Sequence, residues 1–189
     1  MSDVAILEIP EVRARVSPIT VAQYHDFPEF NERGRRTELI RGIVFEKMPK
    51  SPLHRTIATR LYRLILSALP HDFIAWKEEP LTLRDSEPEP DISVARGNEN
   101  TFSARNATTA AIVIEIAITS ASEDRALAAL YAEAGVEEYW IVLPRERKIE
   151  VYRHPADGIY RELKVIEGEA ILECCSVPEI RIALGELFA

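Results

Sequence analysis

The chain has 189 residues but only two cysteines, Cys174 and Cys175, and these are adjacent. Adjacent cysteines are poorly placed to bridge each other, and two thiols suggest neither a disulfide framework nor a zinc site. No apolar run reaches the roughly 18–20 residues that span a bilayer. The N-terminus MSDVAILEIP lacks the basic region and long apolar core of a secretion signal. These absences predict a protein of the reducing cytoplasm with no membrane partner.

An excess of basic residues is also lacking. The 23 Lys and Arg residues face 31 Asp and Glu residues, so the formal net charge is -8. Nucleic-acid affinity is largely neutralisation of phosphates, so this surface should repel a duplex unless its basic residues cluster. The arginines between Arg33 and Arg63 could form such a cluster, although solvated surface arginines are the simpler interpretation.

The length and the order of the elements predict one domain of mixed α/β (α+β) class. We expect an N-terminal arm over residues 1–18 and a single domain over residues 19–189, because this length can bury a core without disulfides or metals. The patterns alternate roughly as helix, strands, long helix, strands, helix, strands, which is typical of a mixed β-sheet flanked by helices. The first helix is expected from Ile19 to Phe30, ending near Gly34.

Two further helices carry clear end signals. Ser51 can cap a helix whose first position is Pro52, and apolar residues recur through that helix at helical spacing. A second helix is capped by Ser120 or Ser122 and ends near Gly135. The strand–helix–strand segment from residue 110 to residue 143 suits a parallel crossover.

The stretch AIVIEIAITS reads as an interior strand with a carboxylate near its centre. Side chains alternate faces along a strand, so Glu115 lies opposite the isoleucines, beside the small Ala117. The strand DISVARG repeats this arrangement with Asp91 next to small residues. If the two strands are neighbours, the carboxylates converge and one pKa should rise unless a cation sits between them. Mg²⁺ or Mn²⁺ suits such oxygen ligands.

Structural interpretations of both acids stay open from the residue types alone. Glu115 could pair with an arginine from a nearby helix, since structural ion pairs commonly hold buried charge. Asp91 follows a proline, and aspartate in that place favours a turn by bonding its own backbone. Tyr131, Tyr139 and Trp140 are expected to be core aromatics rather than a platform for stacking bases, given their helical and strand spacing.

Several stretches in order resemble a known family. PD followed by an apolar strand carrying E-x-A is similar to the signature of the PD-(D/E)XK nuclease superfamily. ELIRG, SPLH, PDISV, IVIEIAITS and DRALAALYAEAGVEEYWIVLP narrow this to the Uma-two family of restriction-endonuclease-like proteins, and the resemblance covers about residues 19–165.

The resemblance implies a metal-dependent nuclease core with named roles. Asp91 and Glu115 look like the metal-binding acids, and the backbone carbonyl of Ile116 would be a third ligand for Mg²⁺ or Mn²⁺. Glu38 in ELIRG looks like an additional acid, with a surface charge as its alternative. His54 in SPLH matches the family's histidine at the start of the long helix, and a solvated first-turn residue is its alternative.

The family's usual lysine is absent. The superfamily places it two residues after the glutamate, where this chain has Ala117, and the Uma-two spacing D-R-x-x-K ends here at Ala128. A positioned cation at developing charge is often worth several kcal/mol. Arg125 and Lys77 are the predicted substitutes.

Three functions therefore stay open. The leading hypothesis is a Mg²⁺-dependent endonuclease that cleaves DNA, with a homodimer expected by analogy with other nuclease-fold proteins of this size. The second is a weakened or inactive nuclease-fold module that binds nucleic acid or protein. The third is a structural homodimer whose acids merely pair with arginines.

Overall fold

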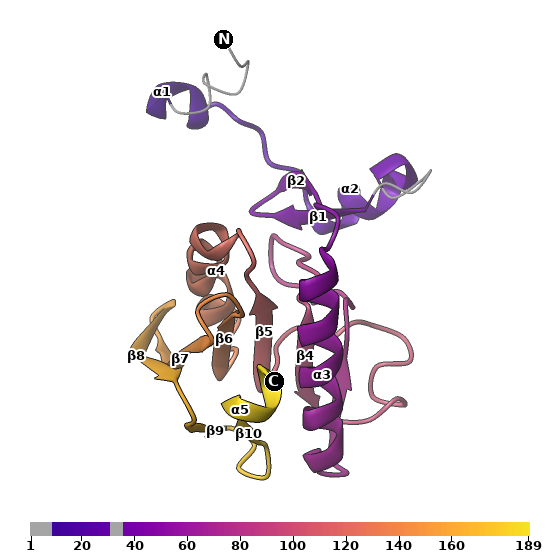
Figure 1. Ribbon diagram of the computed structural model, residues 1–189. Coiled ribbons are helices and arrows are strands. Elements are labelled where there is room, and N and C mark those ends of the chain that lie inside the picture. The colour runs from indigo at the N-terminus through magenta and orange to yellow at the C-terminus, as the bar shows by residue number, and fades with distance from the viewer. Residues whose placement is uncertain (1–8, 31–35) are drawn as a thin grey trace. The chain divides into compact units, whose positions relative to one another are not determined.

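The structure is a computed structural model that describes residues 9–30 and 36–189 (Figure 1). It divides into two compact units, and each is described by itself. The first comprises Met1–Lys47 and Arg84–Glu87, and the second comprises Met48–Leu83 and Pro88–Ala189. None of the helices in the described residues combines the length and the apolarity that a membrane span requires.

The first unit contains short helices and a β-hairpin. Its elements are α1 (Pro10–Arg13), α2 (Val21–Asp26), the 3-10 helix η2 (Pro28–Phe30), β1 (Thr37–Ile40) and β2 (Ile43–Glu46). The strands pair antiparallel around a turn at Arg41 and Gly42. Both turn residues have positive φ, 53° and 74°, as a two-residue hairpin turn requires.

The predicted first helix is shorter than expected. Thr20 caps α2 in a capping box with Gln23. The helix ends because Pro28 disfavours helical geometry at Phe27, so residues 28–30 form a separate 3-10 turn. The expected end near Gly34 lies outside the described residues, as do Arg33 and the first eight residues of the predicted arm.

The second unit is built on a mixed sheet, which confirms the predicted fold class. The sheet order is β3-β4-β5-β6-β7-β8, with β5 and β6 parallel and the other neighbours antiparallel. A separate antiparallel pair joins β9 and β10. The bounds are α3 (Pro52–Ala68), β3 (Phe73–Trp76), β4 (Ile92–Arg96), β5 (Ile112–Ile116), α4 (Ala121–Glu133), β6 (Glu138–Leu143), β7 (Lys148–Ala156), β8 (Ile159–Glu167), β9 (Ile171–Glu173), β10 (Arg181–Ala183) and α5 (Leu184–Leu187). The C-terminal helix α5 was not predicted, because four residues carry too little periodicity.

The isoleucine face of β5 forms the main core with α3. The Ser51 hydroxyl accepts a hydrogen bond from the His54 N–H at 3.2 Å, and Pro52 occupies the first turn, as predicted. The buried apolar side chains of α3 pack with the isoleucines of β5 in one hydrophobic cluster. Its central members are Ile57, Leu61, Ile65, Ile112, Ile114 and Ile116.

The opposite face of the sheet carries buried aromatic side chains. Tyr131 of α4 and Tyr139 of β6 are fully buried there, with ring centroids 4.8 Å apart. Trp140, the next residue on β6, is fully buried on the isoleucine face. These rings are core residues, as predicted. Because both faces of the sheet are covered here, any buried polar group on its central strands needs a defined partner.

Glu138 is such a buried group, and it has several partners. Arg153 Nε donates to Glu138 Oε2 at 2.8 Å, and the Trp140 indole donates to the same atom at 3.1 Å. Oε1 accepts the Ser176 N–H at 2.8 Å. Burial alone would raise the pKa of Glu138, but these bonds, with that from Arg153 foremost, hold the pKa below its usual value. The ionised carboxylate therefore stabilises the fold.

We expect Glu138→Gln to lower the free energy of unfolding by about 2 kcal/mol at neutral pH, because Arg153 loses its counter-charge. The wild-type contribution is present above the ordinary pKa of 4.5 and is lost as the pH falls through the lower folded-state pKa. Urea denaturation across a pH series measures both effects. The exposed Glu179→Gln is the matched control, and equal stability of the two variants would contradict this role.

Candidate active site

Asp91 and Glu115 meet where β4 begins. The antiparallel register pairs Ile92 with Ile114, so the preceding Asp91 lies across from Glu115. The Asp91 N–H donates to Glu115 Oε2 at 3.2 Å, and the Ile116 N–H donates to Asp91 Oδ2 at 2.8 Å. The Asp91 side chain therefore bonds across to β5 rather than only to its own turn. The structure brings the two sequence-predicted acids and Ile116 together.

His54 reaches this pair from the first turn of α3. Its Nε2 lies 2.8 Å from Asp91 Oδ2, and the residue is 8% exposed. Since a carboxylate accepts, this ring nitrogen donates the hydrogen. Within the described residues, the buried Nδ1 atom makes no hydrogen bond. The Ser51 cap fixes the first turn of the helix and so sets the position of His54.

Lys50 is a basic residue of the site that the sequence analysis missed. Its Nζ lies 2.6 Å from Asp91 Oδ1 and 3.0 Å from Glu78 Oε1, and its side chain is 19% exposed. The ammonium group therefore bridges two carboxylates. One signal was available: Lys50 directly precedes the Ser51 cap, four residues before His54. The sequence could not show that residue 78 and residue 91 meet there.

The backbone at Glu78 brings its carboxylate to Lys50. Glu78 follows β3 by two residues and adopts a φ of 58°, which is uncommon for a residue with a side chain. Its N–H donates to the Pro90 carbonyl at 3.2 Å, which joins the segment after β3 to the residue before Asp91. Glu78 was not predicted as a site residue, because the pair of glutamates in KEEP resembles ordinary surface charge.

Charge pairing determines the ionisation of this cluster. Burial alone would raise the pKa of Asp91, but the hydrogen bond from His54 and the charge of Lys50 lower it below its ordinary value. Burial would lower the pKa of Lys50, but the charge of Asp91 and the bonds to Asp91 and Glu78 raise it. Asp91 is therefore an anion and Lys50 a cation near neutral pH.

Tyr131 holds the other acid. Its hydroxyl donates to Glu115 Oε1 at 3.1 Å, so this core aromatic also orients the carboxylate. Ala128 lies one helical turn before Tyr131 on α4 and is half-buried, so the two residues share a face of the helix. Ala117 follows β5 and is buried. Of the two positions that lack the family lysine, Ala117 thus directly follows the strand of Glu115 and Ala128 lies on the helix of Tyr131.

The two predicted substitutes occupy different surroundings. Arg125 makes a two-point ion pair with Glu150 of β7, Nε to Oε2 at 2.8 Å and a terminal nitrogen to Oε1 at 2.6 Å. The bonds from Arg125 lower the pKa of Glu150. Lys77 directly follows β3 and is half-buried. A role for either in catalysis stays a prediction.

Glu38 belongs to the first unit. It lies on β1, and its Oε2 is 3.4 Å from Lys47 Nζ. Its predicted membership of the acid site stays a prediction.

The acid pair fits a hard divalent ion held by few protein ligands. In residues 9–30 and 36–189, no three His, Cys, Asp or Glu side chains gather as a metal-binding group. Mg²⁺ commonly takes one or two carboxylates, keeps several waters and uses substrate phosphates for the rest. Asp91 and Glu115 supply two carboxylates of that kind side by side, and the Ile116 carbonyl stays a predicted third ligand.

The second unit thus has a six-stranded mixed sheet with two acids side by side where β4 begins, and a solved structure shows the same fold. "Crystal structure of a putative nuclease belonging to DUF820 from Anabaena variabilis ATCC 29413" matches with a TM-score of 0.74 and 24% identity, over 90% of this chain and 98% of that one. The family model Uma2, described as "Putative restriction endonuclease", matches residues 21–185. The chain therefore belongs to the Uma2 family. No curated protein matches it.

Proposed function

We propose that this protein is a Mg²⁺- or Mn²⁺-dependent endonuclease that hydrolyses phosphodiester bonds, with DNA as its substrate. The observation that carries the proposal is the juxtaposition of Asp91 and Glu115 on neighbouring strands, with the Asp91 N–H 3.2 Å from Glu115 Oε2. Membership of the Uma2 family supports nuclease chemistry for this pair. The homodimer and the cytoplasmic location stay predictions from the sequence.

Each residue of the site has a distinct task in this proposal. Asp91, Glu115 and the Ile116 carbonyl would hold the divalent ion, which supplies a Lewis acid at the scissile phosphate and a bound water of lowered pKa. His54 and the Ile116 N–H hold Asp91 Oδ2, and Tyr131 holds Glu115. Lys50 would place its positive charge beside the phosphate as negative charge develops there.

The proposal predicts that purified protein nicks supercoiled plasmid in the presence of Mg²⁺ or Mn²⁺ and stops when EDTA removes the metal. The expected products carry 5′-phosphates, which a ligase seals without prior kinase treatment. Gel electrophoresis measures both results. Failure to cleave plasmid, linear duplex and branched DNA with either metal would remove the proposal.

A second candidate is a binding module with the same fold and little turnover. Alanine at positions 117 and 128 favours it, because neither side chain can stabilise charge at the phosphate. The variant Ala128→Lys separates the candidates, since position 128 shares a helix face with Tyr131. Cleavage that appears only in this variant, and depends on Asp91 and Glu115, would support the module. Rapid turnover by the wild type would exclude it.

A further inference from the structure

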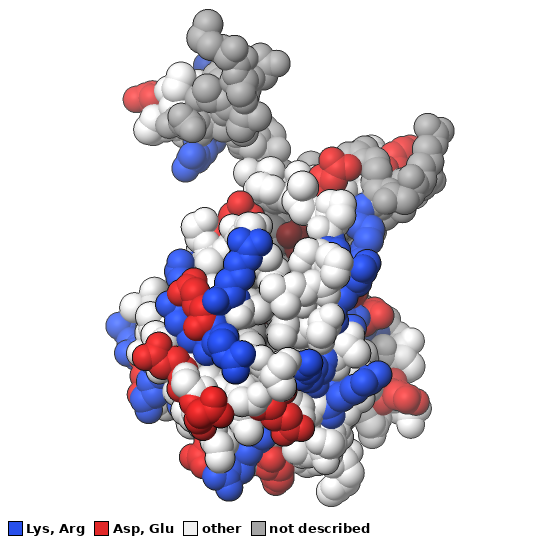
Figure 2. Space-filling view, viewed as in Figure 1, with Lys and Arg blue, Asp and Glu red and all other residues white. Residues whose placement is uncertain are grey.

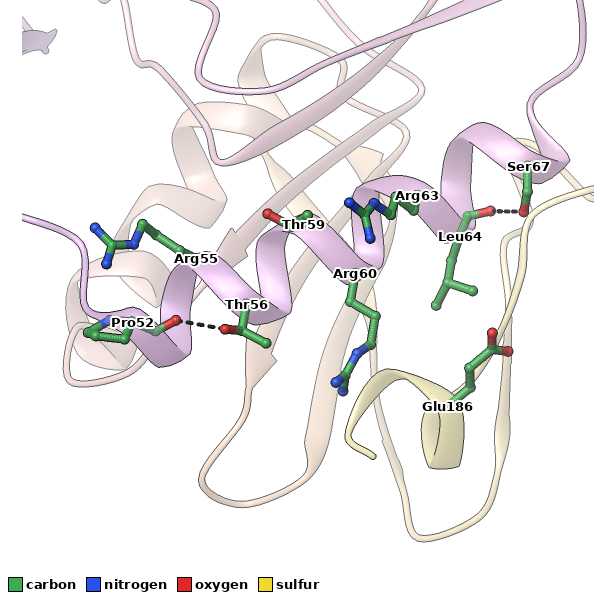
Figure 3. Close-up of a pocket in the computed structure, with 9 residues that line it drawn as sticks. All are labelled: Pro52, Arg55, Thr56, Thr59, Arg60, Arg63, Leu64, Ser67 and Glu186. Carbon is green, nitrogen blue, oxygen red and sulfur yellow. Dashed lines mark hydrogen bonds between the residues drawn. The ribbon is translucent and has the colours of Figure 1, made fainter.

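An open groove of about 800 Å³ runs along the outer face of α3 (Figure 3). Arginines on the helix line much of it, and Glu186 of α5 lies near Leu64 at its other side. Figure 2 shows separate groups of Lys and Arg side chains beside and over this helix, with uncharged surface between them. The groove is therefore a locally basic feature of a chain whose net charge is -8.

The arginines of the groove differ in their availability. One terminal nitrogen of Arg60 donates to the Leu187 carbonyl at 2.6 Å and to the Ala189 carbonyl at 2.8 Å, so Arg60 ties α3 to the C-terminus. Arg55 and Arg63 are exposed. Within the part of the chain that the structure describes, neither makes an ion pair or a side-chain hydrogen bond. These two guanidinium groups are free to bind an anion.

Their spacing forms a track rather than a single point. Arg55, Thr59 and Arg63 recur every four residues and so share one face of α3. The eight-residue separation of the arginines corresponds to about 12 Å along the axis. A single small anion could contact both arginines only if their guanidinium groups converged. A nucleic-acid backbone can instead contact each guanidinium group with a different phosphate. Arginine forks suit phosphate oxygens, and hydroxyl groups such as that of Thr59 add donors.

The track begins next to the acid site. Arg55 immediately follows His54, whose ring contacts Asp91 from the inner side of the same helix. The α3 N-terminus, which is the positive end of the helix dipole, is also at this end. Glu186 lies at the opposite side of the groove, where Leu64 points toward it, and a phosphate would be repelled there. The charge distribution thus favours a polyanion on the face of α3 that carries Arg55 and Arg63, which point away from Glu186 (Figure 3).

We infer that Arg55 and Arg63 bind the phosphate backbone of the nucleic acid and lead it along α3 to the acid site. This inference rests on the proposed function, because it names the surface that holds the substrate. Contacts of this kind position a strand without reading its sequence, so they add affinity for any sequence and a strong dependence on salt.

The test measures binding without cleavage. Fluorescence anisotropy of a labelled duplex and of its single strand is recorded in EDTA at several salt concentrations. We expect Arg55→Ala/Arg63→Ala to weaken binding by at least about tenfold and to reduce the slope of log K against log salt by about 2. The matched control is Arg105→Ala/Arg145→Ala, which removes the same charge from exposed positions outside the groove.

The outcomes separate the groove from the chemistry. If both double variants weaken nucleic-acid binding equally, the effect is one of general charge and the inference is wrong. The inference is also wrong if Arg55→Ala/Arg63→Ala binds as tightly as the wild type. Failure of the wild type to bind either nucleic acid at low salt would overturn it as well. Wild-type protein that binds through these arginines but cleaves nothing with metal would support the groove while removing the proposed endonuclease activity.

Discussion

Replacing Asp91 with asparagine is expected to lower the single-turnover rate of metal-dependent DNA cleavage by about 1,000-fold or more. The carboxylate of Asp91 meets Lys50 through one oxygen and His54 and the Ile116 N–H through the other. Asparagine keeps the size but loses the negative charge and one acceptor. It therefore removes the anion around which Lys50, His54 and a metal ion would be arranged.

The measurement pairs cleavage with metal affinity. Mn²⁺ binding, followed by electron paramagnetic resonance, should weaken in Asp91→Asn and in Glu115→Gln, and the double variant should lose little more activity than either single one, because the acids act as a unit. Asp72→Asn is the control, since Asp72 is an exposed acid that pairs with Arg96 in the same unit. Full cleavage by Asp91→Asn would place the chemistry elsewhere.

Local patterns predicted the elements that carry this site. Alternation along AIVIEIAITS separated Glu115 from the isoleucines, and those isoleucines do pack against α3. The Ser51 cap and Pro52 predicted where α3 begins, so they also predicted that His54 lies in its first turn. Strand alternation and helix caps depend on residues that are close in the sequence, so the sequence was enough to predict them.

The partners of the charged groups depended on tertiary pairing and were not predictable. Lys50 meets Glu78 and Asp91, which lie 28 and 41 positions further along the chain. Arg125 was a candidate for the site because it precedes Ala128 by three residues, yet its guanidinium pairs with Glu150 on β7. Sequence spacing describes one helix face but not which strand lies opposite it.

Among the basic residues, Lys50 is therefore the one whose removal should lower the cleavage rate most. We expect Lys50→Ala to lower the cleavage rate by about 100-fold or more, because a positioned ammonium beside the phosphate stabilises the developing charge. Lys50→Arg keeps the charge but not the point-like geometry, so partial activity is expected. Lys77→Ala and Arg125→Ala test the two substitutes that the sequence suggested, and Lys164→Ala is the surface control.

Metal affinity distinguishes a direct role of Lys50 from simple loss of structure. The Lys50 ammonium lies 2.6 Å from Asp91 Oδ1, an oxygen that a metal would also use. Removing the ammonium frees this oxygen, so Mn²⁺ should bind Lys50→Ala at least as tightly as the wild type while cleavage falls. If affinity and cleavage fall together, Lys50 serves to hold Asp91 in place. Unchanged cleavage by Lys50→Ala would show that Lys50 is not the catalytic cation. If Lys77→Ala or Arg125→Ala lowers the cleavage rate instead, that residue supplies the positive charge beside the phosphate.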